Sequence, residues 1–277
     1  MLPDFHTISR KDGVAETMVV LALIGSQRKK GNTARVVQMI EMCMQTLAAQ
    51  HATPLEFETL FLGDLDMRPC RGCRACFVSG EEACPIEDDI PLIRAKMDAA
   101  DALILASPVY VDDVSGLVKT WMDRLAYLCH RPALGGKCAY PLATVGGSSP
   151  NHALRTMNAA LLTWGYHLVG QTGLKMGALA STDELARYQP AADKVADQLF
   201  RAVVGQHALK PTFISLMVFK IQQLTWQREP PGSYDYAYWQ AQGWLDPGCT
   251  FYLPHRANPV KVTLARLVGA GISCFVV

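Results

Sequence analysis

Short apolar runs alternate with amphipathic stretches along most of the chain. A continuous apolar run predicts a strand buried on both faces, because a strand with one wet face would alternate apolar and polar residues. Such runs predict strands at 18–24, 102–106 and 140–145, and we interpret 55–62 and 166–169 as two further strands. Apolar residues at helical spacing predict a helix capped by Thr33, a helix from Asp88 or Asp89 and a helix after Ser115. The same spacing predicts further helices at 150–164 and 183–208.

Strands that alternate with helices imply right-handed crossovers and a parallel sheet covered on both faces. The expected fold class is therefore α/β, a flavodoxin-like three-layer sandwich with a five-stranded parallel sheet in the order 2-1-3-4-5. Ligands of such a sheet bind beyond the carboxyl ends of the strands. The predicted parts are an N-terminal arm (1–16), the α/β domain (17–208) with a cysteine-rich insertion (63–87), and an aromatic-rich C-terminal extension (209–277).

The composition indicates a packed globular protein. Half of the residues (50%) are hydrophobic, 18% are charged and the formal net charge is +1, so neither disorder nor a nucleic-acid partner is expected. No secretory signal opens the sequence, which favours a cytoplasmic protein with reduced thiols. The apolar tail 260–277 carries Lys261 and Arg266. We interpret it as a core or interface segment and expect no membrane partner.

The turn after the first predicted strand has the chemistry of a phosphate site. Ser26 and Thr33 hydroxyls, the Asn32 amide and N–H groups at the helix start can donate to a phosphate monoester, and the helix dipole favours the dianion. Arg28 adds a bidentate cation. An ordinary glycine-rich turn is the alternative. Neither a Gly-x-Gly-x-x-Gly dinucleotide motif nor a Gly-Lys-Ser/Thr Walker motif is present.

Three motifs at predicted strand ends resemble those of a known group of flavoproteins. The run Gly25-Ser26-x-Arg28-x-x-Gly31-Asn32-Thr33 is similar to the phosphate loop of the NADPH-dependent FMN reductase and iron–sulfur flavoprotein families. Their second flavin loop is matched by Ser107-Pro108-Val109-Tyr110, with Val114-Ser115-Gly116-x-x-Lys119 and Asp123-Arg124-Leu125 after it, and their third by Gly146-Gly147-Ser148. The resemblance covers residues 17–205. It implies an FMN site made by Ser26, Arg28, Gly31, Asn32, Thr33, Ser107, Pro108, Val109, Tyr110, Gly146, Gly147 and Ser148.

The second and third loops also have a physical logic of their own. Pro108 is expected to end the third strand and stiffen the loop, so that its backbone meets the polar edge of the flavin ring while Tyr110 offers an aromatic face. Gly146 and Gly147 allow the backbone to approach a flat ring. The alternative for 107–110 is a simple strand-terminating turn.

Four of the nine cysteines lie close together in the sequence. Cys70, Cys73, Cys76 and Cys84 form C-x2-C-x2-C-x7-C followed by proline, which is similar to the run that holds a [4Fe–4S] cluster in bacterial ferredoxins. Arginines 68, 71 and 74 are expected to offset the negative charge of such a cluster and raise its reduction potential. The gap before Cys84 lies at the long end of the iron–sulfur flavoprotein pattern.

Other uses of these cysteines stay open. A structural zinc usually takes two separated C-x2-C pairs, which fits this spacing less well. A redox-active disulfide and a degenerate insertion with free thiols are the remaining alternatives. The other five cysteines, at 43, 129, 138, 249 and 274, are expected to be small core residues.

The resemblance implies an FMN-dependent oxidoreductase that takes electrons from NAD(P)H, with the cluster passing them on singly. FMN itself carries the chemistry, so no catalytic side chain is assigned. The electron acceptor would be a small molecule or ferredoxin, and the protein a homodimer or homotetramer. One alternative is a flavodoxin-like electron carrier reduced by ferredoxin, and another is a flavin-free binding module. The extension would cover the flavin, clasp a partner subunit, or pack on the outer face of the sheet.

Overall fold

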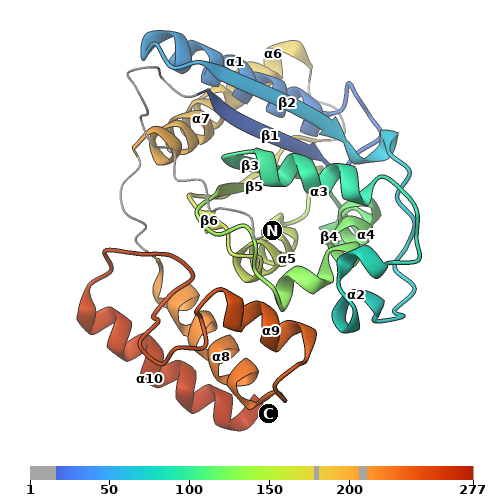
Figure 1. Ribbon diagram of the computed structural model, residues 1–277. Coiled ribbons are helices and arrows are strands. Elements are labelled where there is room, and N and C mark those ends of the chain that lie inside the picture. Colours follow the sequence, from blue (N-terminus) through green and yellow to red (C-terminus); the bar gives the residue numbers. More distant parts are fainter. Residues whose placement is uncertain (1–16, 178–180, 206–210, 277) are drawn as a thin grey trace.

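The computed structural model describes residues 17–177, 181–205 and 211–276. The predicted N-terminal arm lies outside these residues. Seven strands form the sheet, and the main path runs β2-β1-β3-β5-β6 with parallel neighbours (Figure 1). Strand β7 also pairs with β5 in parallel, whereas β4 pairs with β3 in antiparallel fashion. The strands are β1 (Met18–Ile24), β2 (Leu55–Phe61), β3 (Ala102–Tyr110), β4 (Asp113–Val114), β5 (Cys138–Val145), β6 (His167–Leu168) and β7 (Thr172–Lys175).

The α/β class and the order 2-1-3-4-5 are confirmed. The predicted fifth strand (166–169) is β6, and β4 and β7 are two further strands that were not predicted. Both β6 and β7 pair with β5. Gly170 lies between them, and a Cβ atom there would stand 2.7 Å from the Tyr140 ring. The Tyr140 hydroxyl is hydrogen-bonded to the Thr172 hydroxyl at 2.9 Å. The edge of the sheet is therefore interrupted where the chain passes this ring.

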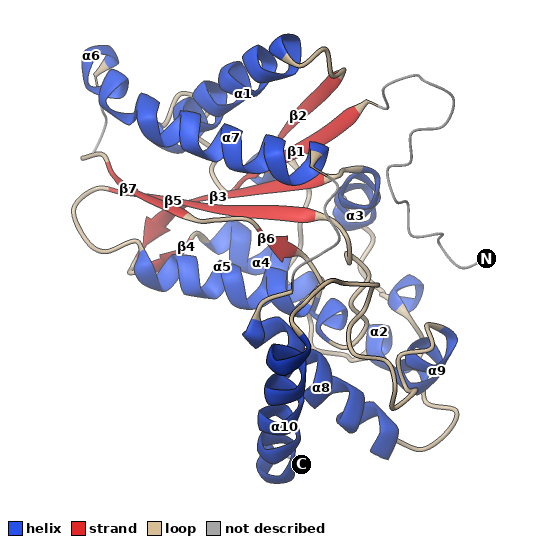
Figure 2. Ribbon diagram, turned by 90° about the vertical axis from the view of Figure 1, so that its left-hand side faces the viewer, coloured by secondary structure: helices blue, strands red, loops and turns tan. Residues whose placement is uncertain are grey.

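Helices cover both faces of the sheet (Figure 2). Val20 and Ile24 of β1 point into the core under α1 (Asn32–Gln50) and α7 (Gln189–Val204). Leu21 and Leu23 point into the opposite core, under α3 (Ile90–Ala99), α4 (Gly116–Arg124) and α5 (Asn151–Thr163). Burial on both faces explains why β1 is apolar without alternation.

The start of α1 differs from the prediction. The helix begins at Asn32, its N-cap is Gly31 in an extended conformation, and no side chain caps it. Thr33 lies inside the first turn, and its hydroxyl forms a 2.6 Å hydrogen bond with the Thr144 hydroxyl of β5. The predicted Thr33 cap is therefore wrong, because this side chain is buried against the sheet.

Pro108 does not end the third strand as predicted, because β3 continues to Tyr110. The pairing of β1 with β3 stops at Ala106, whose carbonyl accepts a hydrogen bond from Gly25. Pro108 lies two residues further on and faces the same side of the strand, where β1 has already ended. The N–H group that proline lacks therefore costs no ladder hydrogen bond.

The helix predicted at 183–208 is three separate pieces. Ser181 caps α6 (Thr182–Leu185) in a capping box with Glu184, and a 3-10 turn (Ala186–Tyr188) precedes α7. A proline lies in the first turn of α7, where a missing N–H is tolerated but a continuous helix is not. Residues 206–208 lie outside the described part of the chain.

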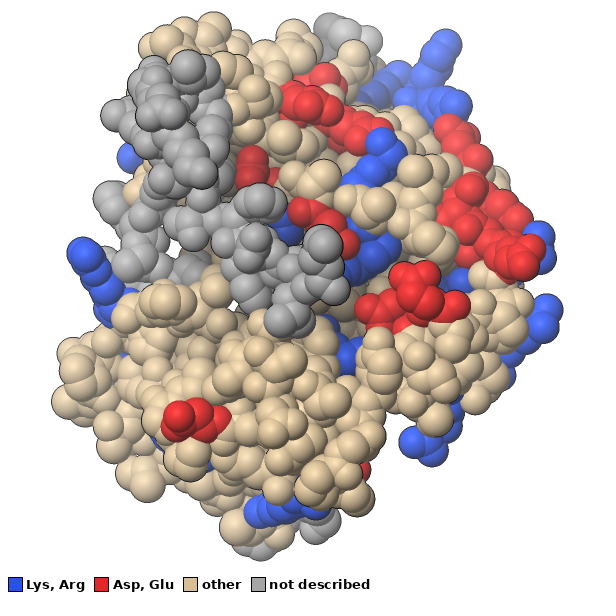
Figure 3. Space-filling view, in the orientation of Figure 1, with Lys and Arg blue, Asp and Glu red and all other residues tan. Residues whose placement is uncertain are grey.

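The described residues of the C-terminal extension form three helices, α8 (Phe213–Arg228), α9 (Tyr234–Ala241) and α10 (Pro259–Val276). Its sequence pattern predicts one helix, a linker and a small capping segment. The three helices lie together below the sheet domain in Figure 1 and have their own aromatic core, which includes Phe219, Trp239 and Trp244. Figure 3 shows few charged side chains on this part of the visible face.

Helix α10 is both packed and exposed. It lies against α8, where a Cβ atom at Gly269 would come within 2.8 Å of the Met217 carbonyl oxygen. Its other side exposes Val260, Leu264 and Leu267. No helix in the described residues is long and apolar enough to cross a bilayer.

Short elements complete the chain between β2 and β5. They are a 3-10 turn after β2 (Leu62–Asp64), the short helix α2 (Ala75–Val78), and 3-10 turns at Glu81–Ala83 and Ala126–Cys129. Of the four clustered cysteines, Cys76 lies in α2, Cys70 and Cys73 precede this helix, and Cys84 directly follows the turn Glu81–Ala83.

Candidate flavin site and cysteine segment

The phosphate-like turn is held close to the start of α4. The Gly25 N–H donates to the Ala106 carbonyl at 2.8 Å. A Cβ atom at Gly25 would lie 2.2 Å from Val118 and 2.8 Å from the Ser115 hydroxyl oxygen. Only glycine allows the end of β1 to approach α4 this closely.

The turn itself is closed by internal hydrogen bonds. The Arg28 N–H donates to the Ser26 hydroxyl oxygen at 3.0 Å, and the Gly31 N–H donates to the Arg28 carbonyl at 3.0 Å. The Arg28 side chain is exposed at the amino end of α1, and the Ser26 hydroxyl keeps its own proton for an acceptor. A helix N-terminus, a hydroxyl donor and a free-standing guanidinium are suited to a phosphate dianion.

The second loop is rigid because its hydroxyl groups are used within it. The Ser107 hydroxyl donates to the Pro108 carbonyl at 2.8 Å and accepts from the Ser115 N–H at 3.0 Å. Ser115 in turn caps α4 by accepting from the Val118 N–H. Tyr110 is 54% exposed at the end of β3. The loop therefore offers backbone and the Tyr110 ring to a ligand, whereas the Ser107 hydroxyl is occupied.

The third loop leaves space beside its backbone. A Cβ atom at Gly147 would meet no atom within 4 Å, and one at Gly146 would approach only Gly177, at 3.8 Å. The Gly177 N–H donates to the Gly146 carbonyl at 3.1 Å, and the Asn32 amide donates to the Gly177 carbonyl at 3.4 Å. Gly177 thus connects the third loop to the start of α1. Ser148 is exposed beside them.

All twelve predicted flavin-site residues lie in or beside the loops that follow β1, β3 and β5. Because these strands are parallel neighbours, the three loops share one edge of the sheet. Open space beside two glycines fits a flat ring, and the α1 terminus with Arg28 fits its phosphate. The residues present therefore match an FMN site in shape and charge.

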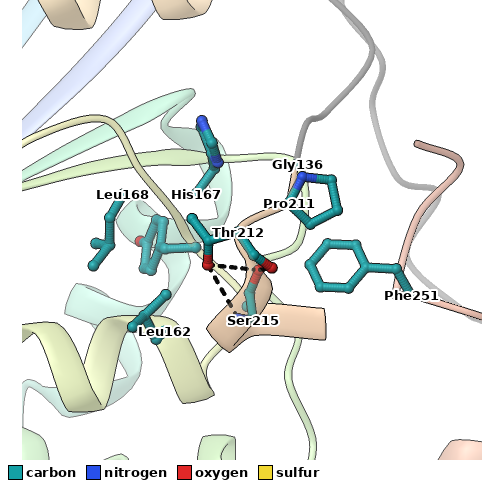
Figure 4. Close-up of a pocket in the computed structure, with 10 residues that line it drawn as sticks. Gly136, Leu162, His167, Leu168, Pro211, Thr212, Ser215 and Phe251 are labelled. Carbon is teal, nitrogen blue, oxygen red and sulfur yellow. Dashed lines mark hydrogen bonds between the residues drawn. The ribbon is translucent and has the colours of Figure 1, made fainter. Parts of the chain in front are cut away.

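Two hollows of the described structure lie elsewhere. One, of about 20 Å³, lies between the amino ends of β5 and β6 and the start of α8, where Thr212 and Ser215 are hydrogen-bonded to each other (Figure 4). It has room for about one water molecule. The other, of about 430 Å³, is a groove between α1 and α7 beside Met42 and Asp193. Neither includes a residue of the three loops.

The cysteine segment, defined here as residues 70–84, lies in loops around α2. Cys70 and Cys73 are exposed, whereas Cys76 and Cys84 are half-buried, and all four thiols are free. Burial raises the pKa of the Cys76 thiol, and the neighbouring Cys70 and Cys84 raise it further while Arg131 lowers it. Within the described residues, no three His, Cys, Asp or Glu side chains are arranged to hold a metal ion. Four clustered thiolates are still a donor set that suits iron or zinc.

The three arginines expected to balance cluster charge are exposed. Arg68 forms a surface ion pair with Asp66 at 3.1 Å, and arginines 71 and 74 are exposed as well. Cys274, expected in the core, is exposed, whereas Cys138 is buried as expected. Two buried arginines, Arg124 and Arg131, lie near the cysteine segment, and no prediction from the sequence assigned either of them a role there.

Arg124, at the carboxyl end of α4, is 7% exposed and contacts both ends of the segment. Its Nη1 donates to the Arg68 carbonyl at 2.9 Å, and its Nη2 lies 3.7 Å from the Cys84 sulfur. It also forms an ion pair with Asp88, whose side chain is fully buried. Burial alone would raise the pKa of Asp88, but hydrogen bonds from Arg124 hold it below its usual value.

Arg131, after the next 3-10 turn, is 2% exposed. Its Nη2 donates to the Cys76 carbonyl at 2.6 Å and to the Glu81 carboxylate at 3.1 Å, and its Nη1 pairs with Asp235 of α9. The extension therefore reaches the cysteine segment through Asp235.

The fold and the three loops define an FMN-binding α/β oxidoreductase of the flavodoxin-like class. Residues 18–177 match the pattern of the NADPH-dependent FMN reductase family, and the chain belongs to that family.

Curated relatives share sequence with this chain to different extents. An iron–sulfur flavoprotein of Archaeoglobus fulgidus is 28% identical over 234 residues, which cover 82% of this chain and all of the relative. One of Methanocaldococcus jannaschii is 40% identical over 107 residues, or 39% of this chain and 51% of the relative. The chain thus spans about half the length of this second relative.

Solved structures share the fold. RosB with a bound 8-demethyl-8-formylriboflavin-5'-phosphate aligns with a TM-score of 0.53 and 15% identity over 87% of this chain and 92% of its own. A flavone reductase aligns with a TM-score of 0.51 and 16% identity over 67% of this chain and 63% of its own. At these identities the likeness concerns the fold alone.

Proposed function

We propose that this protein is an NAD(P)H-dependent FMN reductase whose cysteine segment holds a [4Fe–4S] cluster. The observation that carries the flavin part is the meeting of three loops at one edge of the sheet, where Gly177 links the start of α1 to the third loop and the space at Gly147 is open. The names of the curated relatives, all called iron–sulfur flavoproteins in the cases above, support the cluster.

The chain's own residues would hold and orient the cofactor. Ser26, Arg28 and the first N–H groups of α1 would bind the phosphate, and the backbone after β3 and β5 would bind the ring. When bound, FMN supplies hydride acceptance and one-electron transfer. The loop of Tyr110 would limit access of water and substrate to one side of the ring. No side chain of the site is required to move a proton.

Helix α4 connects the two candidate sites. Its amino end contacts the second flavin loop through Ser115, and its carboxyl end carries Arg124 beside Cys84. Nine residues of helix span about 13 Å. We infer that Cys70, Cys73, Cys76 and Cys84 would bind the cluster, which would supply one-electron transfer toward a small-molecule acceptor or ferredoxin.

The test is anaerobic purification followed by spectroscopy. We expect bound FMN, together with about four irons and four sulfides for each chain. Anaerobic NADPH or NADH should bleach the flavin absorbance. Cys73→Ser should lose iron, while Cys274→Ser, which changes an exposed cysteine outside the segment, should keep it.

Each of the other possible results would assign a different function to the protein. FMN without iron in the native protein would remove the cluster and leave the reductase. Flavin that resists NAD(P)H but is bleached by reduced ferredoxin would make the protein an electron carrier. A colourless protein that does not take up FMN would reject the flavin function and leave a binding module.

A further inference from the structure

We propose that Arg124 and Arg131 are positioning residues that clamp the cysteine segment from its two sides, one from the flavin domain and one from the C-terminal extension. The purpose that we give to this clamp rests on the proposed cluster function. The contacts that form the clamp are present without a metal.

Arg124 closes the two ends of the segment. Its guanidinium donates to the carbonyl of Arg68, just before Cys70, and to that of Ile86, just after Cys84, at 2.9 and 3.5 Å. Asp88 completes the closure, because it pairs with Arg124 and accepts from the Arg68 N–H at 2.9 Å. One buried ion pair therefore brings the residues on either side of the segment together.

The same guanidinium locates Cys84. The long gap before this cysteine leaves its place open on sequence grounds, whereas the structure puts its sulfur 3.7 Å from Nη2 of Arg124. Arginine suits this task because its planar fork holds several acceptors in fixed directions.

Arg131 holds the middle of the segment. It donates to the Cys76 carbonyl and to Glu81, and its guanidinium lies over the Tyr234 ring at 4.8 Å. Asp235 anchors it from α9 and also accepts a 2.8 Å contact from His130.

Close packing reinforces this side. The Phe77 ring, next to Cys76, lies 4.6 Å from the His130 ring. A Cβ atom at Gly80 would lie 2.6 Å from the Tyr234 hydroxyl oxygen, so the segment and α9 are in tight contact. The extension thus supports the cysteines, which gives this part of the chain a specific role.

The charges define what the clamp does. Arg124 is paired with Asp88, and Arg131 with Asp235 and Glu81, so neither guanidinium brings an unpaired positive charge to the thiols. The clamp therefore fixes the shape of the segment more than it tunes a reduction potential. This differs from charge compensation by the exposed arginines.

The experiment measures the metal-free full-length protein. Native-state alkylation of Cys76 and Cys84 is followed by mass spectrometry, with hydrogen exchange of residues 70–84, in the wild type, Arg131→Lys and Asp235→Asn. Arg71→Gln is the matched control, because Arg71 is an exposed arginine of the same segment.

We expect Arg131→Lys and Asp235→Asn to alkylate Cys76 about tenfold faster, because the loss of charge-assisted hydrogen bonds makes local opening easier. Arg71→Gln should match the wild type. Unchanged rates in both variants would overturn the clamp. The clamp would also be overturned if the backbone amides of residues 76–84 exchanged as fast in the wild type as in an unfolded chain. This second measurement does not depend on the folding of any variant.

Reconstitution separates this inference from the proposed function. If the clamp serves a cluster, the two variants should bind less iron and sulfide than Arg71→Gln after the same treatment. Wild-type protein that binds no iron while its thiols remain protected would end the cluster function and leave the clamp standing.

Discussion

The candidate flavin edge, where the loops after β1, β3 and β5 meet, and the cysteine segment are held in place by different kinds of contact. At this edge, the short turns are closed by hydrogen bonds within each turn, such as the one from the Gly31 N–H to the Arg28 carbonyl. The turns lie close together because the strands that precede them are neighbours. The cysteine segment contains only one short helix, and its position depends on Arg124 and Arg131, which come from well beyond it in the chain. A motif that sits on regular structure is placed by that structure, whereas one in a loop needs distant side chains.

The largest effect should come from breaking the buried pair beneath the cysteine segment. Arg124→Met leaves the fully buried Asp88 carboxylate without its partner, which should lower the free energy of unfolding by about 3–5 kcal/mol. Chemical denaturation measures the change. Arg68→Met removes an exposed arginine and should cost less than about 1 kcal/mol. Equal losses in the two variants would contradict the distinction between buried and exposed arginines.

The next largest loss of stability should come from substituting Gly25 at the candidate flavin edge. Gly25→Ala would place a Cβ atom 2.2 Å from Val118, and relief of this overlap should cost about 1–3 kcal/mol and shift the second flavin loop. Thermal unfolding and FMN titration report the two effects. Gly147→Ala adds a methyl group in open space, so its stability should stay close to that of the wild type. A fully stable Gly25→Ala protein would show that β1 and α4 are less closely packed than described.

Arg28 tests the flavin edge without disturbing the fold. Because its side chain is exposed at the start of α1, Arg28→Ala should weaken FMN binding about 10- to 100-fold, the value of one charge-assisted contact, and leave the melting temperature of the FMN-free protein unchanged. Lys30→Ala, in the same turn, is the control and should change affinity much less. Fluorescence titration with FMN measures both. Equal affinities for the two variants would place the phosphate elsewhere.

Low pH should lower the stability of the fold slightly, through Asp88 next to the cysteine segment. The pKa of Asp88 in the folded protein lies below its usual value of 3.8, so its ion pair contributes stability above that pH. The contribution is lost as the pH falls through the lower, folded-state pKa. Stability should therefore decline below about pH 4 more steeply in the wild type than in Asp88→Asn. Parallel curves from urea unfolding at several pH values would show that Asp88 does not titrate with folding.

The sequence predicted regular structure better than it predicted local exceptions. The apolar runs placed β1, β3 and β5 within a few residues, because burial on both faces leaves a strong pattern. The edge strand β2 is only half-buried and was still placed within one residue. The predicted helix cap at Thr33 is wrong, because its hydroxyl is hydrogen-bonded to β5. The predicted strand end at Pro108 is wrong as well, because this proline is tolerated where β1 has already ended. Both errors depend on which strand lies alongside, and no local pattern records that.

The three candidate flavin loops are predicted from the order of their motifs, and the strands that precede them are neighbours in the sheet. Arg124 belongs to the motif that resembles the second flavin loop, whereas Arg131 belongs to no motif. A signal was present, since arginine in an apolar stretch such as Leu128–Leu134 requires a partner when buried. That partner, Asp235, lies 104 residues away. Its identity could not be read from neighbouring residues.

Hydrophobic pattern and short-range spacing are enough to predict the parallel α/β sheet, the three loops at strand ends and the group of four cysteines. They do not predict that a buried arginine of α4 contacts Cys84, or that the extension packs against the cysteine segment through Arg131. A buried guanidinium requires a carboxylate partner, and only folding brings together partners that are distant in the chain.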